Sequence, residues 1–417
     1  MSAHQFLVPG FIDTHTHAPQ YVNSGIGLDL PLLDWLQCYT FPRESEFKDV
    51  KVAERIYPAA VRRHLSFGTT TCCYYGTIHL EATTLLVDVI EALGQRAFVG
   101  KVCMDRNSPE ALTESTEASI ENTKAFVAYV EAKKNDLITP ILTPRFVPSC
   151  TSACMHALGR MAKDKNLPIQ SHLSENLKEI QWVHELYPEA RDYTTVYDLH
   201  GLLTDRTIMA HGIHLSTDEK ELLRNRGSGV SHCPNSNFGI SSGVCHVRGL
   251  IDAGVKVGLG TDVSGGHHPS MMDAMKHCVL ASKVLALPSK SPADSMVKTP
   301  GAPLTVAEAF HLATMGSAEL CGIQNVVGNF VVGKEWDAVL VDMKQLHVQL
   351  NVTHEEMGRH QHGHALENFA VHLENNVDLW HHDDLKTMFE KFIYLGDDRN
   401  VSKVWVKGRL VKGNVEK

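Results

Sequence analysis

Short apolar runs rich in β-formers alternate along the chain with longer segments whose apolar residues recur at helical spacing. The short runs predict strands at Gly10–Asp13, Thr69–Tyr75, Ala97–Val102, Ile138–Thr143, Pro168–His172, Thr207–His211, Gly229–His232 and Val255–Thr261. The helical patterns between them lie at Val50–Phe67, Thr83–Leu93, Thr116–Lys133, Thr151–Lys165, Asn176–Leu186, Ser216–Asn225 and Val244–Ala253. This alternation over about 250 residues predicts an α/β protein with a (β/α)8 barrel. A doubly wound open sheet is the alternative, but no GxGxxG motif follows the first strand.

The pattern changes after the last predicted barrel strand. Helices are expected at Ser270–Leu287 and Thr305–Cys321, the second with a Thr305 and Glu308 capping box. Two later runs, 328–342 and 401–412, alternate like antiparallel strands and predict a small β-sandwich domain. The predicted domains are the barrel at 9–325 with 377–397 packed on it, the small β domain at 326–344 and 399–413, and a polar His-rich insertion at 345–376.

Composition narrows the class of protein. The chain has 417 residues, 43% hydrophobic and 21% charged, which suits a large globular domain with a minor one. Its net charge of -9 gives no reason to expect binding to nucleic acid or an anionic membrane. With no apolar run of transmembrane length and no secretory signal pattern, we expect a cytosolic protein whose ten cysteines are reduced.

Histidines stand at the ends of several predicted strands. His15 and His17 in PGFIDTHTH are two positions apart, so their side chains face the same side of a strand. A pair of surface histidines would have the same spacing. His172, His211 and Asp262 each end another predicted strand, and the carboxyl ends of barrel strands meet at one mouth. Imidazoles and a carboxylate gathered there predict a site for one divalent metal, either Zn²⁺ or Fe²⁺.

A carboxylate follows one of these histidines. Glu175 lies three residues after His172 and is interpreted as a proton shuttle, although a charge at a helix N-terminus would look the same. His232, in the turn SHCPNSN, is interpreted as a residue that shapes the barrel mouth rather than a metal ligand. The PCxxC and HxE motifs of the zinc cytidine deaminases are absent, which excludes that fold.

The motifs PGFIDTHTH, HLSE, the later strand-end His211 and GTD resemble the amidohydrolase superfamily. Within it the chain is most similar to the guanine deaminase family. The similarity runs from about Pro9 to Cys321 and then in patches, through the segments DTHTHAPQY, LDLPLLDWLQCYTFP, GQRAFVGKVCMD, TPRF, HLSEN, MAHGIHLS, SHCPNSN, GLGTDVSGG and YLGDDRN.

This resemblance implies a homodimeric enzyme that hydrolyses guanine to xanthine and ammonia. By resemblance the Zn²⁺ ligands are His15, His17, His172 and Asp262, and the catalytic residues are Glu175, Asp262 and His211. The substrate contacts expected from it are His17, Gln20, Arg145, Phe146, His172, Glu175 and His211. Arg145 suits a carbonyl acceptor such as O6, and Phe146 could stack on the purine.

The start of the chain departs from the family pattern. Family members carry a longer N-terminal segment that completes the small β domain, whereas only MSAHQFLV precedes Pro9 here. The C-terminal strands are therefore expected to lack partners, leaving the small domain incomplete. Two alternatives stay open: an aminohydrolase for a pterin, triazine or adenine-like ring, and a truncated, non-catalytic variant.

Overall fold

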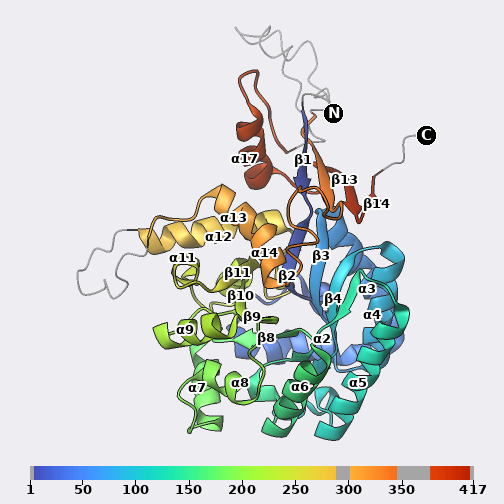
Figure 1. The fold of residues 1–417 in the computed structure, drawn as a ribbon, viewed down its shortest axis with the longest axis vertical. Helices are drawn as coiled ribbons and strands as arrows, with labels where there is room; N and C mark the ends of the chain where they lie inside the picture. The colour runs from blue at the N-terminus through green and yellow to red at the C-terminus, as the bar shows by residue number, and fades with distance from the viewer. Residues whose placement is uncertain (1–3, 288–300, 345–375, 414–417) are drawn as a thin grey trace, which may run out of the picture.

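The computed structural model describes residues 4–287, 301–344 and 376–413 (Figure 1). Its largest feature is a closed barrel of parallel strands, formed by two four-stranded arcs with the orders β2-β3-β4-β6 and β11-β10-β9-β8. The strands are β2 (Phe11–His17), β3 (Thr69–Tyr75), β4 (Arg96–Gly100), β6 (Ile138–Pro140), β8 (Ile169–Leu173), β9 (Thr207–His211), β10 (Gly229–His232) and β11 (Lys256–Leu259).

Backbone hydrogen bonds close both seams between the arcs. On one side, Asp262 N donates to His15 O at 2.8 Å and His17 N donates to Val263 O at 3.0 Å. On the other, Leu142 forms a parallel bridge with Ile169. Two short strands, β5 (Val102–Cys103) and β7 (Thr143–Pro144), pair with each other beyond β4 and β6. The barrel is confirmed, and an open sheet is excluded.

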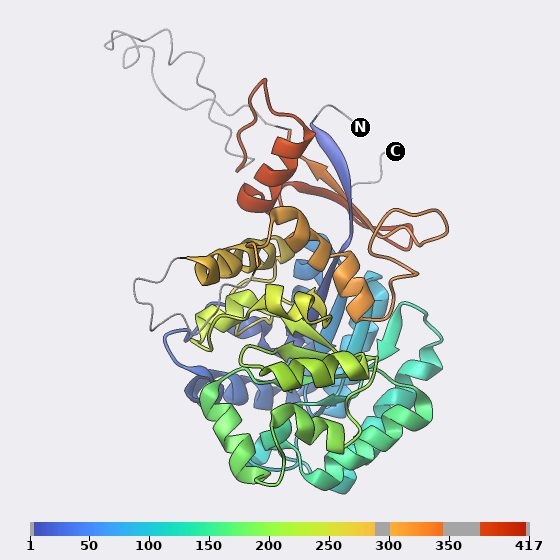
Figure 2. The ribbon, with the colours of Figure 1, turned by 60° about the vertical axis from the view of Figure 1, so that its left-hand side comes forward.

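Helices surround the barrel on its outside (Figure 2). They are α3 (Val50–Ser66), α4 (Leu80–Leu93), α5 (Thr116–Lys133), α6 (Ser152–Lys165), α7 (Leu177–Leu186), α8 (Tyr193–Leu199), α9 (Thr217–Arg226), α10 (Pro234–Gly239), α11 (Val247–Asp252) and α12 (Met271–Ala286). Capping boxes at Asn176 and Ser216 satisfy the first amides of α7 and α9, which explains why these helices begin where the sequence predicts. None of the helices in the described ranges is long and apolar enough to cross a membrane.

The expected single helix at Thr305–Cys321 is wrong, because the chain forms two helices, α13 (Val306–Leu312) and α14 (Met315–Leu320). Between them the carbonyl of Ala313 leaves the helical ladder and accepts a hydrogen bond from Ile12 N of β2 at 2.9 Å. Apolar residues of α14, Ala318 and Leu320, then join a cluster with Ile12 inside the barrel. Tertiary packing overrides the local helical pattern at this point.

The expectation that the C-terminal strands lack partners is also wrong. The described residues contain a four-stranded sheet with the order β1-β12-β13-β14, formed by β1 (Gln5–Pro9), β12 (Ala338–Asp342), β13 (Val401–Val406) and β14 (Arg409–Lys412). The N-terminal residues therefore supply an antiparallel neighbour to β12, with Phe6 opposite Val341. The strand expected from 328 begins only at Ala338.

Helix α17 (Leu385–Leu395) joins this small sheet to the barrel. Its Phe392 contacts Phe6 of β1 edge to face, with 5.9 Å between ring centroids. Its Phe389 contacts Phe310 of α13 in the same manner at 5.0 Å. The His-rich insertion predicted at 345–376 lies outside the described residues except for its last position, and the division into domains stays a prediction.

Candidate metal and substrate site

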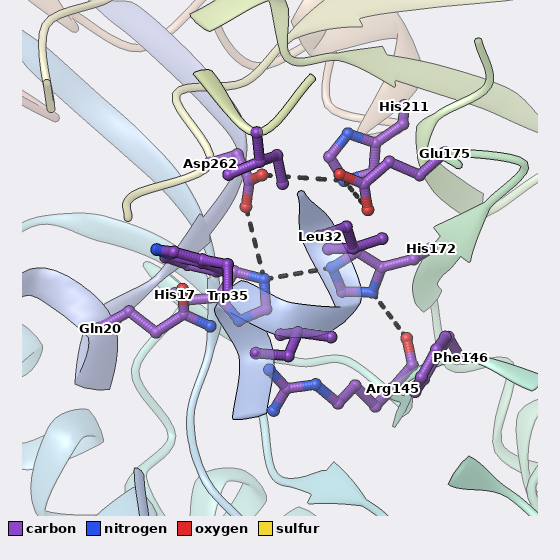
Figure 3. Close-up of a pocket in the computed structure, with 12 residues that line it drawn as sticks. His17, Gln20, Leu32, Trp35, Arg145, Phe146, His172, Glu175, His211 and Asp262 are labelled. Carbon is purple, nitrogen blue, oxygen red and sulfur yellow. Dashed lines mark hydrogen bonds and ion pairs between the residues drawn. The ribbon is translucent and has the colours of Figure 1, made fainter. Parts of the chain in front are cut away.

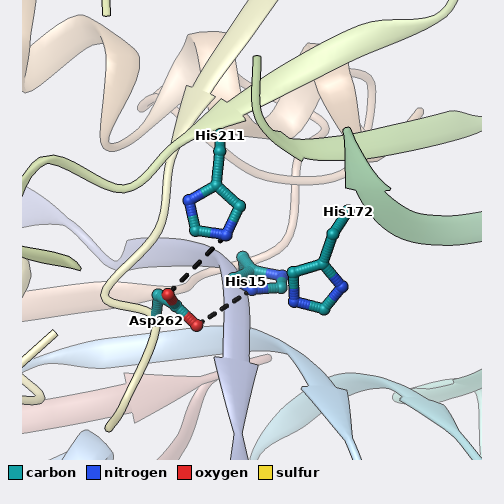
Figure 4. A group of neighbouring side chains, drawn as sticks. All are labelled: His15, His172, His211 and Asp262. Atoms are coloured by element: carbon teal, nitrogen blue, oxygen red, sulfur yellow. Dashed lines mark ion pairs between the residues drawn. The ribbon is translucent and has the colours of Figure 1, made fainter. Parts of the chain in front are cut away.

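The predicted strand-end residues come together at the carboxyl end of the barrel (Figure 4). His15 and His17 lie at the end of β2, His172 in β8 and His211 at the end of β9. Asp262 follows β11 by three residues. His15 Nε2 lies 3.0 Å from Asp262 Oδ1, although 247 positions separate them in the chain, because the barrel closes between their strands.

Four of these side chains have the geometry of a metal site. One donor atom each of His15, His172, His211 and Asp262 lies within 4.8 Å of the others. His17 stands beside this group, with its Nε2 3.2 Å from His172 Nε2 and 3.5 Å from Asp262 Oδ1. The structure thus places all five predicted residues at one point, and it brings His211 at least as close to the cluster as His17.

The chemistry of these donors fits a divalent metal. The buried atoms His15 Nε2, His17 Nδ1 and His211 Nε2 have no hydrogen-bond partner among the described residues. Burial lowers the pKa of His15, His17 and His172, which favours the neutral imidazole that binds metals. Burial by itself would raise the pKa of Asp262, but the facing imidazoles, His15 foremost, hold it well below its usual range.

Hydrogen bonds outside the cluster orient two of the imidazoles. His172 Nδ1 donates to the carbonyl of Arg145 at 2.6 Å, and His211 Nδ1 donates to Asn237 Oδ1 at 3.0 Å. Because a carbonyl oxygen can only accept, the proton lies on Nδ1 in both rings and Nε2 is left to face the site. In the sequence, Asn237 stands out only as part of the SHCPNSN turn.

The backbone has an uncommon conformation at the same point. His211 has φ 72° and Asp262 has φ 47°, both in the left-handed region that favours glycine. Aspartate and histidine adopt this conformation more readily than most other residues. At both positions the chain turns at or just after the end of a barrel strand, where the side chain lies at the mouth.

Asp13 supports the cluster, although it was not among the predicted site residues. Its carboxylate accepts hydrogen bonds from Thr261 N at 3.0 Å and Thr261 Oγ1 at 2.5 Å, and also from the amide of His15. Burial raises the pKa of Asp13 to about 6. This residue therefore ties β2 to the segment that carries Asp262, and its place in the PGFIDTHTH motif was the available signal.

Glu175 lies in the loop between β8 and α7, beside the cluster. Its Oε2 is 3.4 Å from His211 Nε2, and its Oε1 accepts a hydrogen bond from Ser242 Oγ at 3.2 Å. Burial first, and the nearby carboxylates of Asp262 and Glu179 next, raise the pKa of Glu175 well above its usual range. A buried carboxyl with a raised pKa is suited to carry a proton near neutral pH.

A pocket opens directly onto these groups (Figure 3). Its polar lining includes the predicted residues Gln20 and Arg145, and Phe146 forms part of its wall. The remaining wall is apolar and was not foreseen: Leu32, Trp35, Leu36 and Ile240. The first three belong to a helical segment made of α1 (Leu32–Trp35), the π-helical turn η2 (Leu36–Thr40) and α2 (Phe41–Ser45). His232 is buried and is not one of the four residues of the cluster.

A second buried carboxylate lies behind the pocket. Glu44 of α2 is 1% exposed and accepts hydrogen bonds from both Arg145 and Gln20. Sequence reasoning missed it, because nothing in the TFPRES run indicates that this glutamate turns inward while its neighbours face solvent.

Comparison with known proteins gives one consistent result. The Amidohydrolase family profile matches residues 6–411. The chain is 47% identical to a guanine deaminase of Dictyostelium discoideum over 98% of its own length and 83% of that protein. It is 43% identical to a guanine deaminase of Mus musculus over 99% and 84%, respectively.

A solved structure agrees with these sequence matches. The chain superposes on the crystal structure of a guanine deaminase from C. acetobutylicum with bound guanine in the active site, with a TM-score of 0.82 and 35% identity. The match covers 97% of this chain and 87% of the other.

Proposed function

Because the chain belongs to the amidohydrolase family and is closely related there to guanine deaminases, we propose that it hydrolyses guanine to xanthine and ammonia. The observation that carries this proposal is the pocket itself. It is lined by a buried carboxyl with a raised pKa, Glu175, by members of the metal-type cluster, and by two side chains suited to a purine, Gln20 and Arg145. The reaction is inferred from the related sequences, and the pocket contains side chains that are suited to it.

The proposed metal is Zn²⁺, held by His15, His17, His172 and Asp262. When bound, it supplies a water whose pKa is lowered enough to attack at neutral pH. The convergence of donor atoms supports this ligand set, since those of His15, His172 and Asp262 lie within 4.8 Å of one another and His17 Nε2 lies 3.2 Å from His172 Nε2. His211 is assigned to orient the water and substrate, because its Nε2 faces both Glu175 and Asp262.

The protein groups then move protons. The attacking water gives a proton to Asp262 as its oxygen bonds to C2 of guanine, and Glu175 protonates the adjacent ring nitrogen. Asp262 next delivers its proton to the C2 amino group, and the deprotonated Glu175 takes the proton left on the added oxygen. The carbon–nitrogen bond breaks with its electron pair on nitrogen, so ammonia leaves and xanthine remains.

Arg145 and Gln20 are assigned to contact the edge of the purine that carries its carbonyl oxygen and ring nitrogen atoms. Arg145 offers fixed N–H donors that match a carbonyl such as O6. Phe146 and the apolar wall cover the ring faces and exclude water. A homodimer and a cytosolic location stay predictions.

Ammonia release from guanine by the purified, zinc-loaded protein tests this function. A pterin, a triazine and adenine are the comparison substrates. Glu175→Gln should keep the metal yet lose turnover by about 10²–10⁴-fold, because it removes a proton carrier and no ligand. Ammonia from adenine or a triazine but not from guanine would refute the assignment, and loss of metal in the variant would refute the role of Glu175.

A further inference from the structure

Glu44 is a buried carboxylate that forms hydrogen bonds with two pocket residues, Arg145 and Gln20. Its Oε2 accepts a hydrogen bond from Arg145 NH1 at 2.5 Å, and its Oε1 accepts one from Arg145 NH2 at 3.1 Å. Oε1 also accepts a hydrogen bond from Gln20 Nε2 at 2.8 Å. One side chain on α2 thereby holds both residues that we assign to the purine edge (Figure 3 shows Gln20 and Arg145 on the same side of the pocket).

These bonds fix the direction of each group. The bidentate pair sets the plane of the Arg145 guanidinium, which also lies over the Phe41 ring at 5.2 Å. The Gln20 amide is held from both ends, because its Oε1 accepts from Ser264 N at 3.2 Å while its Nε2 donates to Glu44. The orientation of this amide is thus determined by the protein rather than by the ligand.

The pair also sets the charge of this part of the pocket. Arg145 is 3% exposed and Glu44 is 1% exposed, so water screens neither charge. Within the described chain, Glu44 is the ion-pair partner of Arg145. Together they present oriented N–H donors with no net charge, which suits a neutral lactam and gives no attraction to an anionic ring.

We propose that Glu44 is a specificity-determining residue that selects neutral guanine and disfavours the xanthine anion, an inference that rests on the proposed function. Xanthine differs from guanine in carrying oxygen in place of the amino group, and it loses a ring proton much more readily. The Arg145–Glu44 pair has no net charge, so it binds neutral guanine and releases the anionic product. An arginine without its carboxylate partner would retain that product.

Glu44→Gln tests this inference with steady-state kinetics at a mildly alkaline pH, where xanthine is largely an anion and guanine is neutral. The KM for guanine should rise by about 10-fold or more, because Arg145 and Gln20 lose the carboxylate that orients them. The kcat should change much less. The inhibition constant of xanthine should move the opposite way and fall several-fold, because Arg145 gains an unpaired charge.

Asp337→Asn is the matched control. Asp337 accepts hydrogen bonds from Arg96 NH2 at 3.1 Å and from Arg96 Nε at 3.3 Å, and both residues are buried outside the pocket. This variant removes one of the two carboxylates that pair with Arg96, the other being Glu335 at 2.6 Å, so it should lower stability without changing either constant. If it reproduces the Glu44→Gln pattern, or if both constants of Glu44→Gln move together or not at all, the inference is overturned.

A double variant covers the case in which Glu44→Gln does not fold. Glu44→Gln with Arg145→Met removes both charges and leaves no buried ion unpaired. It should bind guanine weakly, with no gain of xanthine inhibition; an unchanged KM for guanine would overturn the inference. Wild-type protein that releases no ammonia from guanine would instead refute the proposed function, and that result is separate from any difference between variants.

Discussion

Individual residues at this site depend on partners far away in the chain. Asp262 faces His15 across the barrel seam, and Glu44 meets Arg145 across 101 positions. His17 and His211 differ in what surrounds them. His17 Nε2 faces Asp262 and His172, whereas His211 Nε2 faces Asp262 and Glu175, the proposed proton carrier. This difference is the physical basis for assigning one histidine to the metal and the other to the reacting groups.

We predict that His17→Ala and His211→Asn separate metal binding from turnover. His17→Ala should lose most bound metal, because it removes a ligand. His211→Asn should keep nearly one equivalent per chain yet lose turnover by about 10²–10⁴-fold, because it removes a group that acts on the reactants. Elemental analysis beside ammonia release measures both effects. If His211→Asn lost its metal as completely as His17→Ala, His211 would belong to the ligand set.

At the scale of elements, the outer helices are positioned by close contacts as well as by apolar faces. Gly159 of α6 is buried directly against the turn that ends α8, where a Cβ atom would lie 2.1 Å from the carbonyl oxygen of His200. That turn is held by its own bonds, since His200 Nδ1 donates to Val196 O at 2.6 Å. Neither partner can move without breaking helical structure.

Gly159→Ala should therefore lower stability by about 1–3 kcal/mol, the usual cost of forcing extra volume into a packed contact. Helix propensity by itself would favour alanine there, so the sign of the change identifies the clash. Arg160→Ala, the next residue on the same helix but exposed, is the control and should leave the midpoint of thermal unfolding nearly unchanged. A midpoint for Gly159→Ala equal to that of wild type would contradict the contact.

At the scale of the whole molecule, the small sheet joins the two ends of the described chain. Strand β1 comes from the N-terminus and strands β13 and β14 from the C-terminus, while β12 lies between them in the sheet (Figures 1 and 2). Phe6, 7% exposed, packs from β1 against Phe392 of α17. The N-terminal residues thus contribute to the stability of a region distant from the metal cluster.

Phe6→Ala should destabilise the protein by about 3–5 kcal/mol, as expected when a buried aromatic ring is removed. The KM for guanine and the metal content of the folded fraction should stay unchanged, because the pocket lies at the other end of the barrel strands. Val332→Ala, at a fully exposed position of the same region, serves as the comparison in denaturant unfolding. Equal stability of the two variants would show that β1 does not hold the small sheet.

Local sequence patterns predicted much of the barrel. The bounds of β3, β9 and β10 agree with the sequence prediction, because β-branched and apolar residues bounded by turns specify buried strands wherever they occur. The strand-end positions of His15, His172 and His211 followed from the same register, since all parallel strands place their carboxyl ends at one mouth. These features depend only on residues near one another in the chain.

The remaining features depend on contacts between distant segments. The helix breaks between α13 and α14 where Ile12 bonds to Ala313, and β12 pairs with residues 5–9. The proposed role of Glu44 depends on its contact with Arg145. No periodicity marks them, because each is decided by what the barrel brings alongside. The sequence by itself determined the strands, the direction of their polar ends and the residue types at the mouth. Tertiary structure decided which buried charges form pairs, because folding brings distant segments together and removes water from both partners.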